Sequence, residues 1–535
     1  MKGTGMIQKA GIGLVCIGLA VFVCLPFLGR YALDADHAMR QFDNTDHRVV
    51  LQEAFADLDG ETFSDPFSFV SAYRHAVAQA QEEILQRVTG RGMSPSDEGY
   101  WSAVLQDWEV DQSVFPVARE AIHGVQVARS LAFLLVFGLI VIGALLNILP
   151  KFRGLPGIRN NGIYHSAMHN RGWLGVATGV FLIGFYILIY FYPEYIVAWV
   201  WLVDPVSVAL SGNPAGQWFF YGFVYTLVIL VMGIRMFAKY RHNRYQLIRT
   251  SSVMFFQLAF AFLIPEILVS LNQPYYDFKN IWPLDYDFFF EWHLGQLIES
   301  GRLGLFMLVW GIALIVIAVP VITYFYGKRW YCSWVCGCGG LAETLGDPYR
   351  HLSDKSLGAW KLERWLVHGV LVFAVVMTGM VLYTYFSGNA RVLFLDSFQV
   401  RSWYGFAIGS IFAGVVGTGF YPWFGNRVWC RFGCPLAAYL GLVQRFKSRF
   451  RITTNGGQCI SCGNCSTYCE MGIDVRAYAQ RGQDIVRASC VGCGICAAVC
   501  PRGVLRLENS GLDVSERASE TRTVMITEDQ VRMLD

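Results

Sequence analysis

The sequence has few charged residues for its length. Of its 535 residues only 16% are Asp, Glu, Lys or Arg, whereas 54% are hydrophobic, including 39 Phe and 26 Tyr. This composition argues against a set of soluble domains and indicates a protein with several membrane-spanning helices. The net charge of +3 at pH 7 lacks the basic excess of nucleic-acid-binding proteins, so no nucleic-acid partner is expected.

Several cofactor motifs are also missing. The sequence contains no C-x-x-C-H motif for haem c, no Walker A motif and no convincing dinucleotide fingerprint. Among the histidines, His368 is the one plausible intramembrane residue, so a bis-histidine haem b is not expected. Direct oxidation of NAD by this chain alone is therefore unsupported.

The 15 cysteines are distributed unevenly. Eight occur in two stretches, CISCGNCSTYC and CVGCGICAAVCP, each with cysteines at intervals of three, three and four residues. This pattern is typical of bacterial two-cluster ferredoxins, in which three close thiolates bind one iron–sulfur cluster and the fourth reaches the other cluster. Zinc sites use separated C-x-x-C pairs, and disulfides are not expected in a reducing cytosol.

The pattern predicts two [4Fe–4S] clusters within a small α+β ferredoxin domain. Carried onto this sequence, the first cluster is bound by Cys459, Cys462, Cys465 and Cys500, and the second by Cys490, Cys493, Cys496 and Cys469. Glu470 stands where the second motif has Pro501. We expect this difference to affect the local turn and the reduction potential rather than cluster binding.

Apolar runs long enough to span a bilayer occur at about 8–29, 130–149, 173–192, 217–238, 251–271, 304–326, 365–386 and 403–423. The loops between them alternate in charge, because 150–172, 235–249 and 424–451 are basic without acids, whereas 193–216 and 272–303 are mostly acidic. By the positive-inside rule, the sequence predicts about eight transmembrane helices in a bacterial inner membrane, with both termini in the cytoplasm.

Residues 30–128 differ from the rest of the chain. They carry 17 Asp and Glu, 7 Arg, no Lys and no Cys. Good helix formers dominate, so we expect a helical domain on the outer side of the membrane. Its acidity either attracts a basic extracytoplasmic redox partner or simply keeps the domain soluble. The predicted organisation is an anchor at 1–29, this domain at 30–128, membrane helices at 129–303 and 304–452, the ferredoxin domain at 453–510 and a polar tail at 511–535.

An internal repeat lies at an offset of 98 residues. FYGKRWYCSWVC at 325–336 matches WFGNRVWCRFGC at 423–434. Each copy ends an apolar run and carries a C-x-x-x-C pair, Cys332 with Cys336 and Cys430 with Cys434; Cys338 is an additional thiol. Two such pairs at one membrane edge suit a further iron–sulfur cluster, another metal site or a dithiol–disulfide pair. The alternative is that they are small buried residues.

A C-x-x-x-C(P) repeat at helix ends followed by a two-cluster ferredoxin resembles the NosR/NapH-type membrane polyferredoxins, over about residues 304–510. The resemblance implies electron transfer between the quinone pool and a reductase across the membrane. Copper-reducing accessory proteins of cytochrome oxidase assembly share these elements. The chain departs from the family in lacking a flavin-bearing threonine motif in 30–128 and a proline after the first cysteine pair.

The sequence therefore predicts a membrane-bound iron–sulfur protein that relays electrons between a cytoplasmic donor or acceptor protein and the membrane. The membrane-side partner is expected to be a quinone or a redox subunit, with Glu266, His293 and His368 as candidates for quinone or proton binding. Two alternatives are a metal (copper) reductase that helps to assemble a respiratory complex, and a non-enzymatic scaffold whose clusters sense redox state.

Overall fold

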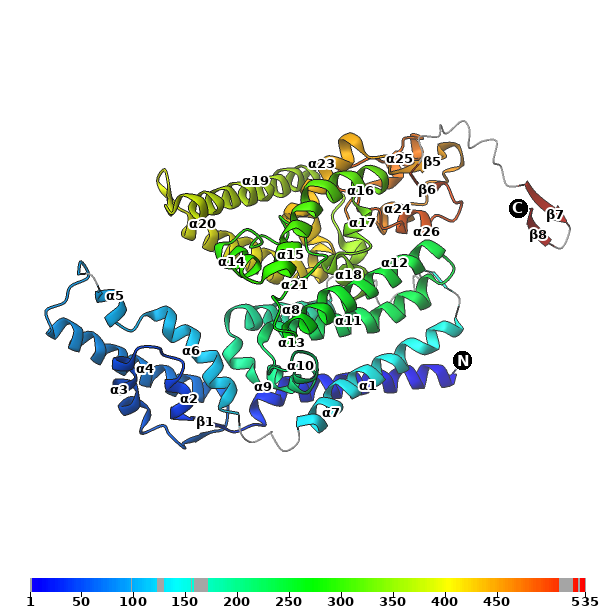
Figure 1. The fold of residues 1–535 in the computed structure, drawn as a ribbon. Coiled ribbons are helices and arrows are strands. Elements are labelled where there is room, and N and C mark those ends of the chain that lie inside the picture. The colour runs from blue at the N-terminus through cyan, green and yellow to red at the C-terminus, as the bar shows by residue number, and fades with distance from the viewer. Residues whose placement is uncertain are drawn as a thin grey trace. The chain divides into compact units, whose positions relative to one another are not determined.

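The computed structural model describes residues 2–97, 99–122, 129–154, 156–157, 172–509, 523–527 and 530–534. The protein is mainly helical, with 71% helix and four two-stranded sheets among these residues (Figure 1). It divides into two compact units. The first comprises Met1–Gly154, Gly184–Leu227 and Glu266–Asn272, and the second comprises Leu155–Ile183, Val228–Pro265 and Gln273–Asp535.

Within these described residues, seven helices are long and apolar enough to cross a membrane: Gly5–Phe27, Ser130–Arg153, Trp173–Phe191, Gln217–Tyr240, Arg244–Ser270, Gly301–Tyr326 and Leu357–Ser387. They correspond in order to the first seven apolar runs of the sequence. A pair of shorter helices, Pro193–Leu202 and Asp204–Ser211, is bent by 72° within a stretch predicted to be an outer loop. Counting that pair as one span raises the number to eight.

The eighth predicted span, 403–423, is not among the seven. It is built from α20 (Ser397–Tyr404), a π-helix (Gly405–Val416), α21 (Gly417–Gly419) and α22 (Tyr421–Phe424). Its many glycines lower its hydropathy, and a break at Phe420 separates α21 from α22. A transmembrane role for this segment stays a prediction.

In the first unit, α1 (Lys2–Cys24) packs along α7 (Arg129–Ile148). Glycines allow this close approach, because a Cβ atom on Gly11 would lie 2.5 Å from the carbonyl oxygen of Gly143. The indole of Trp199 on α9 (Val197–Leu202) donates a 2.7 Å hydrogen bond to the carbonyl of Phe22. The first apolar run is thus integrated into a packed helical unit.

The same unit contains the acidic segment. As the sequence predicts, it is helical, with α2 (Ala35–Met39), α3 (Thr45–Phe55), α4 (Pro66–Gly90), α5 (Tyr100–Ala103) and α6 (Asp107–Glu120). A short sheet pairs β1 (Tyr31–Ala32) with β2 (Thr62–Phe63). The buried acid Asp204 accepts a 2.7 Å hydrogen bond from Arg119, so the domain is tied to the bent helix pair.

The second unit contains the repeat and the ferredoxin domain. Its helices include α12 (Arg244–Phe255), α14 (Glu291–Glu299), α15 (Gly301–Ala313), α16 (Val319–Tyr326), α17 (Arg329–Cys332), α18 (Gly337–Thr344), α19 (Leu357–Ser387) and α23 (Pro435–Lys447). A short 3₁₀ helix, Asp347–Leu352, follows α18. Helix α19 packs against α23.

The ferredoxin domain is closed by one antiparallel strand pair. Strand β5 (Arg451–Thr454) pairs with β6 (Leu505–Glu508), with Arg451 opposite Glu508. Three short helices, α24 (Asn464–Thr467), α25 (Val475–Gln480) and α26 (Ile495–Ala498), lie between the strands. Within the predicted polar tail, β7 (Thr523–Thr527) and β8 (Gln530–Leu534) form a hairpin.

Candidate redox site

Each predicted cysteine quartet lines its own small cavity. Cys459, Cys462, Cys465 and Cys500 line one cavity, and Cys469, Cys490, Cys493 and Cys496 line a second cavity of nearly equal size. In both halves a glycine with positive φ precedes a short helix, Gly463 at 81° before α24 and Gly494 at 74° before α26. The tight loop that this conformation allows turns three closely spaced thiols toward one point.

The chemistry of these thiols fits iron. Burial raises the pKa of Cys490 to about 11, and it also raises the pKa of Cys493 and Cys496 well above the ordinary thiol value. Buried thiolates without a counter-charge are unstable, whereas a metal supplies that charge and displaces the protons. When bound, [4Fe–4S] clusters supply one-electron carriers, and the two quartets are the residues that would hold them.

The loop that carries Cys490 and Cys493 is fixed by residues outside the ferredoxin domain. Four consecutive carbonyl oxygens, of residues 490 to 493, accept hydrogen bonds of 2.7–2.9 Å, in order from Gln444, Ser333, Tyr245 and Gln246. Tyr245 and Gln246 lie on α12, Gln444 lies on α23, and Ser333 directly follows Cys332. The second quartet is thereby held against α12, against α23, which begins after Cys434, and against the turn that follows Cys332.

The repeat itself forms matching turns. Gly327 and Gly425 adopt positive φ values of 64° and 91° at the ends of their preceding helices. Cys336 and Cys434 are the N-cap residues of α18 and α23, and the amide of Ala437 donates to the Sγ of Cys434 at 3.4 Å. Because the first turns of helices carry unpaired N–H groups, these sulfur atoms lie where a negative charge is stabilised.

The two C-x-x-x-C pairs converge. Cys332, Cys336, Cys430 and Cys434 are all buried in one cluster. Burial, reinforced by the charges of Cys430, Cys332 and Cys336, raises the pKa of Cys434 well above the usual thiol value. A hydrogen bond from Cys338, which outweighs burial, lowers the pKa of Cys336 to about 6. Tertiary folding therefore brings four thiols from two distant segments together, with Cys338 beside them.

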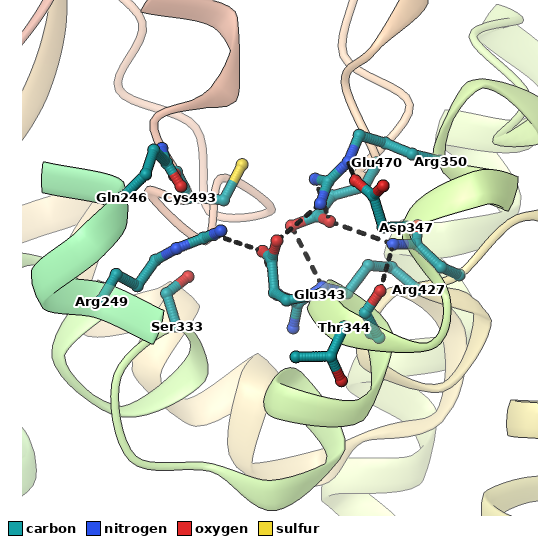
Figure 2. Close-up of polar contacts among 12 residues, drawn as sticks. Gln246, Arg249, Ser333, Glu343, Thr344, Asp347, Arg350, Arg427, Glu470 and Cys493 are labelled. Carbon is teal, nitrogen blue, oxygen red and sulfur yellow. Dashed lines mark hydrogen bonds and ion pairs between the residues drawn. The ribbon is translucent and has the colours of Figure 1, made fainter. Parts of the chain in front are cut away.

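A buried ion-pair network, which the sequence analysis did not anticipate, reaches the repeat thiol of Cys430 through Arg427. Figure 2 shows this network together with Cys493 of the ferredoxin domain. Glu343 on α18 pairs with Arg249 at 2.6 Å, Arg350 at 2.6 Å and Arg427 at 2.8 Å. Burial alone would raise the pKa of Glu343, but the charges of these three arginines hold this pKa well below its ordinary value. Asp347 adds a second carboxylate, which pairs with Lys239 at 2.6 Å.

Glu470 joins this network from the ferredoxin domain. Its carboxylate, which is 0% exposed, pairs with Arg350 at 2.5 Å and with Arg427 at 3.1 Å. Three possible metal ligands lie within 4.8 Å of one another: a carboxylate oxygen of Glu343, one of Glu470, and the thiol of Cys493. Both carboxylates are already paired with arginines. An ion-pair network therefore describes this group better than a cation site. The only sequence signal was Glu470 at the position of a proline.

Arg427 links the network to the repeat. Its guanidinium lies 3.6 Å from the Sγ of Cys430 and donates a 3.2 Å hydrogen bond to the carbonyl of Cys332. The equivalent residue of the first copy, Arg329, instead lies over the Phe450 ring and hydrogen-bonds to Asn509 at 2.7 Å. The two repeat arginines therefore have different roles, and one of them connects Cys430 with Glu470.

A cavity of about 300 Å³ opens beside Cys430. Its lining includes the buried cations Lys328 and Arg431, together with Glu363 and His368. Arg431 pairs through Nε with Glu363 at 2.7 Å, while its Nη2 has no hydrogen-bond partner among the described residues. In the described part of the chain, the one hydrogen bond of the Lys328 Nζ is a long contact of 3.5 Å with the carbonyl of Ala437. This cavity can therefore accept an oxygen-rich or anionic group.

An apolar groove of about 620 Å³ shares two of its lining residues, Leu442 and Phe446, with this cavity. The groove runs between α16 and α23, and its other lining residues are Pro320, Val321, Tyr324, Phe325, Val443 and Lys447. A ligand with a polar head and a long apolar tail matches this combination of lining residues.

The three predicted quinone candidates lie in different surroundings. His368 lines the cavity beside Cys430, and its Nδ1 is 2.6 Å from the carbonyl oxygen of Arg364. His293 is buried against the rings of Trp292 and Phe288, and it does not line this cavity. Glu266, on α13 (Ile264–Ser270), belongs to the first unit. Only His368 is placed beside a cysteine of the repeat.

Two family models match segments of the C-terminal half of the chain. A "4Fe-4S binding domain" matches residues 307–358 and 404–453, which include both copies of the repeat. A "4Fe-4S dicluster domain" matches residues 458–505, which include all eight ferredoxin cysteines. No solved structure matches the chain.

Three curated proteins are similar over part of their length. YccM of Escherichia coli (strain K12), named for electron transport, is 29% identical over 34% of this chain and 50% of its own. The methylamine utilization ferredoxin-type proteins MauN of Methylobacillus flagellatus and Paracoccus denitrificans are 28% and 29% identical, over 27% and 30% of this chain and 50% and 55% of their own. The chain thus spans about half the length of each relative. It carries 4Fe–4S ferredoxin domains in its C-terminal region and is a homologue of the polyferredoxin-type electron transport proteins YccM and MauN.

Proposed function

We propose that this iron–sulfur electron transport protein relays single electrons between a cytoplasmic redox protein and the membrane, through two clusters. The observation that carries the proposal is the pair of cavities, each lined by one predicted cysteine quartet. The carbonyl oxygens of the second quartet accept hydrogen bonds from Ser333, within the first copy of the repeat, and from Gln444 on α23, directly after the second copy, which supports the order of the relay. In this order, the quartet containing Cys493 faces the repeat and the quartet containing Cys462 faces the soluble partner.

The four repeat thiols support a third redox or metal site at the membrane edge, formed by Cys332, Cys336, Cys430 and Cys434. All four are buried together, two of them at helix N-termini, and Arg427 contacts the sulfur of Cys430. The helix N-termini and Arg427 offset part of the cost that burial places on these thiolates, and a bound metal or cluster would supply the remaining positive charge. Cys338 is a fifth thiol within reach of the same site through its hydrogen bond with Cys336.

We assign a quinone to the cavity beside Cys430, with its isoprenoid tail in the α16–α23 groove. A quinol that is oxidised releases two electrons and two protons, whereas a quinone that is reduced takes up the same number. His368 supplies a ring nitrogen for a proton, and Lys328 and Arg431 stabilise negative charge on the quinone oxygens. Each electron then has a short route to Cys430, which lines the same cavity.

The charge pattern of the loops supports a bacterial inner-membrane topology with both termini and the ferredoxin domain in the cytoplasm. Residues 30–128 then lie on the outer side, where an extracytoplasmic redox partner has access to them. Assembly of iron–sulfur clusters in the reducing cytosol is consistent with this orientation.

The test uses full-length protein purified without air and placed in lipid nanodiscs. Adding a short-chain quinol should reduce the clusters, followed by their absorbance and EPR signals. Replacing Lys328 by Gln should slow this reduction at least about tenfold, because about 1.4 kcal/mol of lost stabilisation corresponds to a factor of ten. Lys361→Gln, at an exposed position of α19, is the matched control and should leave the rate unchanged.

Dithionite should reduce the clusters of wild type, Lys328→Gln and Lys361→Gln equally. This equality would show that the clusters of both variants are intact. An unchanged quinol rate in Lys328→Gln contradicts this quinone site. Wild-type protein that fails to react with quinol but reduces Cu(II) to Cu(I) would instead favour the metal-reductase alternative. Clusters that reduce without turnover of either substrate would favour a redox sensor.

A further inference from the structure

The two cysteine quartets differ in access to solvent. Cys462 is exposed, and the neighbouring Ile460 side chain is 56% exposed. In the other quartet Cys490 and Cys496 are each only 6% exposed. Of the two cavities, the one that contains Cys462 is therefore the one that a soluble protein can approach closely enough for electron transfer.

Arginines surround the accessible quartet. Arg476 and Arg502 line its cavity, and Arg481 and Arg506 are also exposed on the same domain. Among the described residues, none of these four guanidinium groups takes part in an ion pair, whereas Glu470 pairs with Arg350 and Arg427. Unpaired arginines around a redox site provide a surface that attracts anionic groups.

The acidic residues of the same domain do not balance this charge at the surface. Residues 458–509 contain four acids, and none of them is exposed, since Glu470 is buried and the other three are half-buried. Asp474 accepts a 2.7 Å hydrogen bond from Ser466, and Asp484 accepts a 3.3 Å hydrogen bond from the amide of Thr454. The charged side chains of residues 458–509 that are exposed are therefore all arginines, whereas the acids are half-buried or buried.

We infer that the soluble partner is a small acidic redox protein with a one-electron iron–sulfur or flavin cofactor, which docks over Ile460, Cys462, Arg476 and Arg502. This inference deepens the proposed relay and rests on it. The exposed Ile460 supplies an apolar centre, and the arginines supply the charged rim that steers encounter. In each exchange the carrier loses one electron and this chain gains one, or the reverse, without bond formation.

The experiment follows the oxidation of a strongly acidic ferredoxin, reduced beforehand, after mixing with the anaerobic holoprotein in neutral-lipid nanodiscs. The double variant Arg476→Gln/Arg502→Gln should lower the second-order rate constant about tenfold at low salt and should flatten its dependence on ionic strength. Arg391→Gln, which removes one exposed arginine from a distant loop, should leave both quantities unchanged.

A positively charged carrier, reduced methyl viologen, should react equally fast or faster with the double variant. Iron content and photoreduction by a neutral deazaflavin serve as checks that the clusters are intact. Equal ferredoxin rates and salt dependence in variant and wild type would overturn the inference. The inference would also be overturned if the double variant differed from wild type only in its binding to anionic vesicles, because that result would identify the arginine surface as a lipid contact. Continued reduction of a short-chain quinone to the quinol by deazaflavin-reduced protein separates failure of docking from failure of the relay.

Discussion

The carboxylate of Glu470 lies 2.5 Å from the guanidinium of Arg350, and both side chains are buried, with 0% and 1% exposed surface. One residue belongs to the ferredoxin domain and the other to the short helix after α18. Glu470 follows the predicted ligand Cys469 directly, where the second half of the motif has a proline. Glu470 therefore anchors the ferredoxin domain, which a proline at this position could not do, because its side chain cannot form an ion pair.

Replacing Glu470 by Gln should destabilise the ferredoxin domain strongly. Arg350 and Arg427 would each lose a buried counter-charge, and breaking a buried pair in this way costs about 3–5 kcal/mol. Denaturant unfolding, followed by the loss of cluster absorbance, measures this change. The control Glu83→Gln breaks an exposed pair with Arg87 and should change stability by less than about 1 kcal/mol. A similarly small effect of Glu470→Gln would show that the network does not hold the domain.

Iron counting distinguishes the three candidate sites. Two four-iron clusters require about eight iron atoms per chain, and a third cluster raises this number. We expect Cys493→Ser and Cys462→Ser each to remove the EPR signal of one cluster, since each quartet lines a separate cavity. Cys16→Ser, in the first apolar run, should leave the count unchanged.

The repeat cysteines are tested by the same measurement. The iron count of the wild-type protein should exceed about eight atoms per chain. Cys430→Ser should lower this iron count, because Cys430 is buried with the other three repeat thiols. A count of about eight that Cys430→Ser does not alter would refute a third cluster and leave a dithiol or packing role for these residues.

The glycines of the repeat should resist substitution. Gly425 has φ 91° and ψ 172°, a region open almost only to glycine, and a Cβ atom there would crowd the backbone of Ser353. Gly425→Ala should cost about 1–3 kcal/mol from backbone strain, with a further cost from the clash. Gly388→Ala is the control, because Gly388 also has positive φ but has open space around it. Equal losses of thermal stability in Gly425→Ala and Gly388→Ala would contradict the proposal that the turn at Gly425 requires glycine.

Accessibility labelling tests the predicted topology. Residues 30–128 contain no cysteine, so Ser96→Cys introduces a single reactive thiol in an exposed turn of this segment. A membrane-impermeant maleimide should label it in intact cells, whereas a cysteine placed at exposed Arg506 should react only after lysis. Labelling of the ferredoxin domain in intact cells would reverse the topology and with it the compartment of the proposed partner.

Local sequence patterns were sufficient to predict part of the fold and part of the candidate site. Seven apolar runs predicted helices long enough to span a bilayer, because burial of backbone groups in lipid leaves few alternatives to a helix. Cysteine spacing predicted two quartets, and the structure places each around one cavity, since ligands three residues apart share a tight loop. The helical nature of 30–128 was equally predictable, because it depends on short-range propensity.

Tertiary structure alone revealed the rest. Glu343, Arg350, Arg427 and Glu470 are separated by up to 127 residues in number, and no periodicity marks them as one buried network. Of the three ionisable candidates near the membrane, His368 lines the cavity beside Cys430 and Glu266 and His293 do not, although nothing in the sequence favoured His368. Burial and pairing of charges depend on how distant segments pack. Residues within one segment do not specify them, and so the spacing of thiols was predictable whereas the surroundings of those thiols were not.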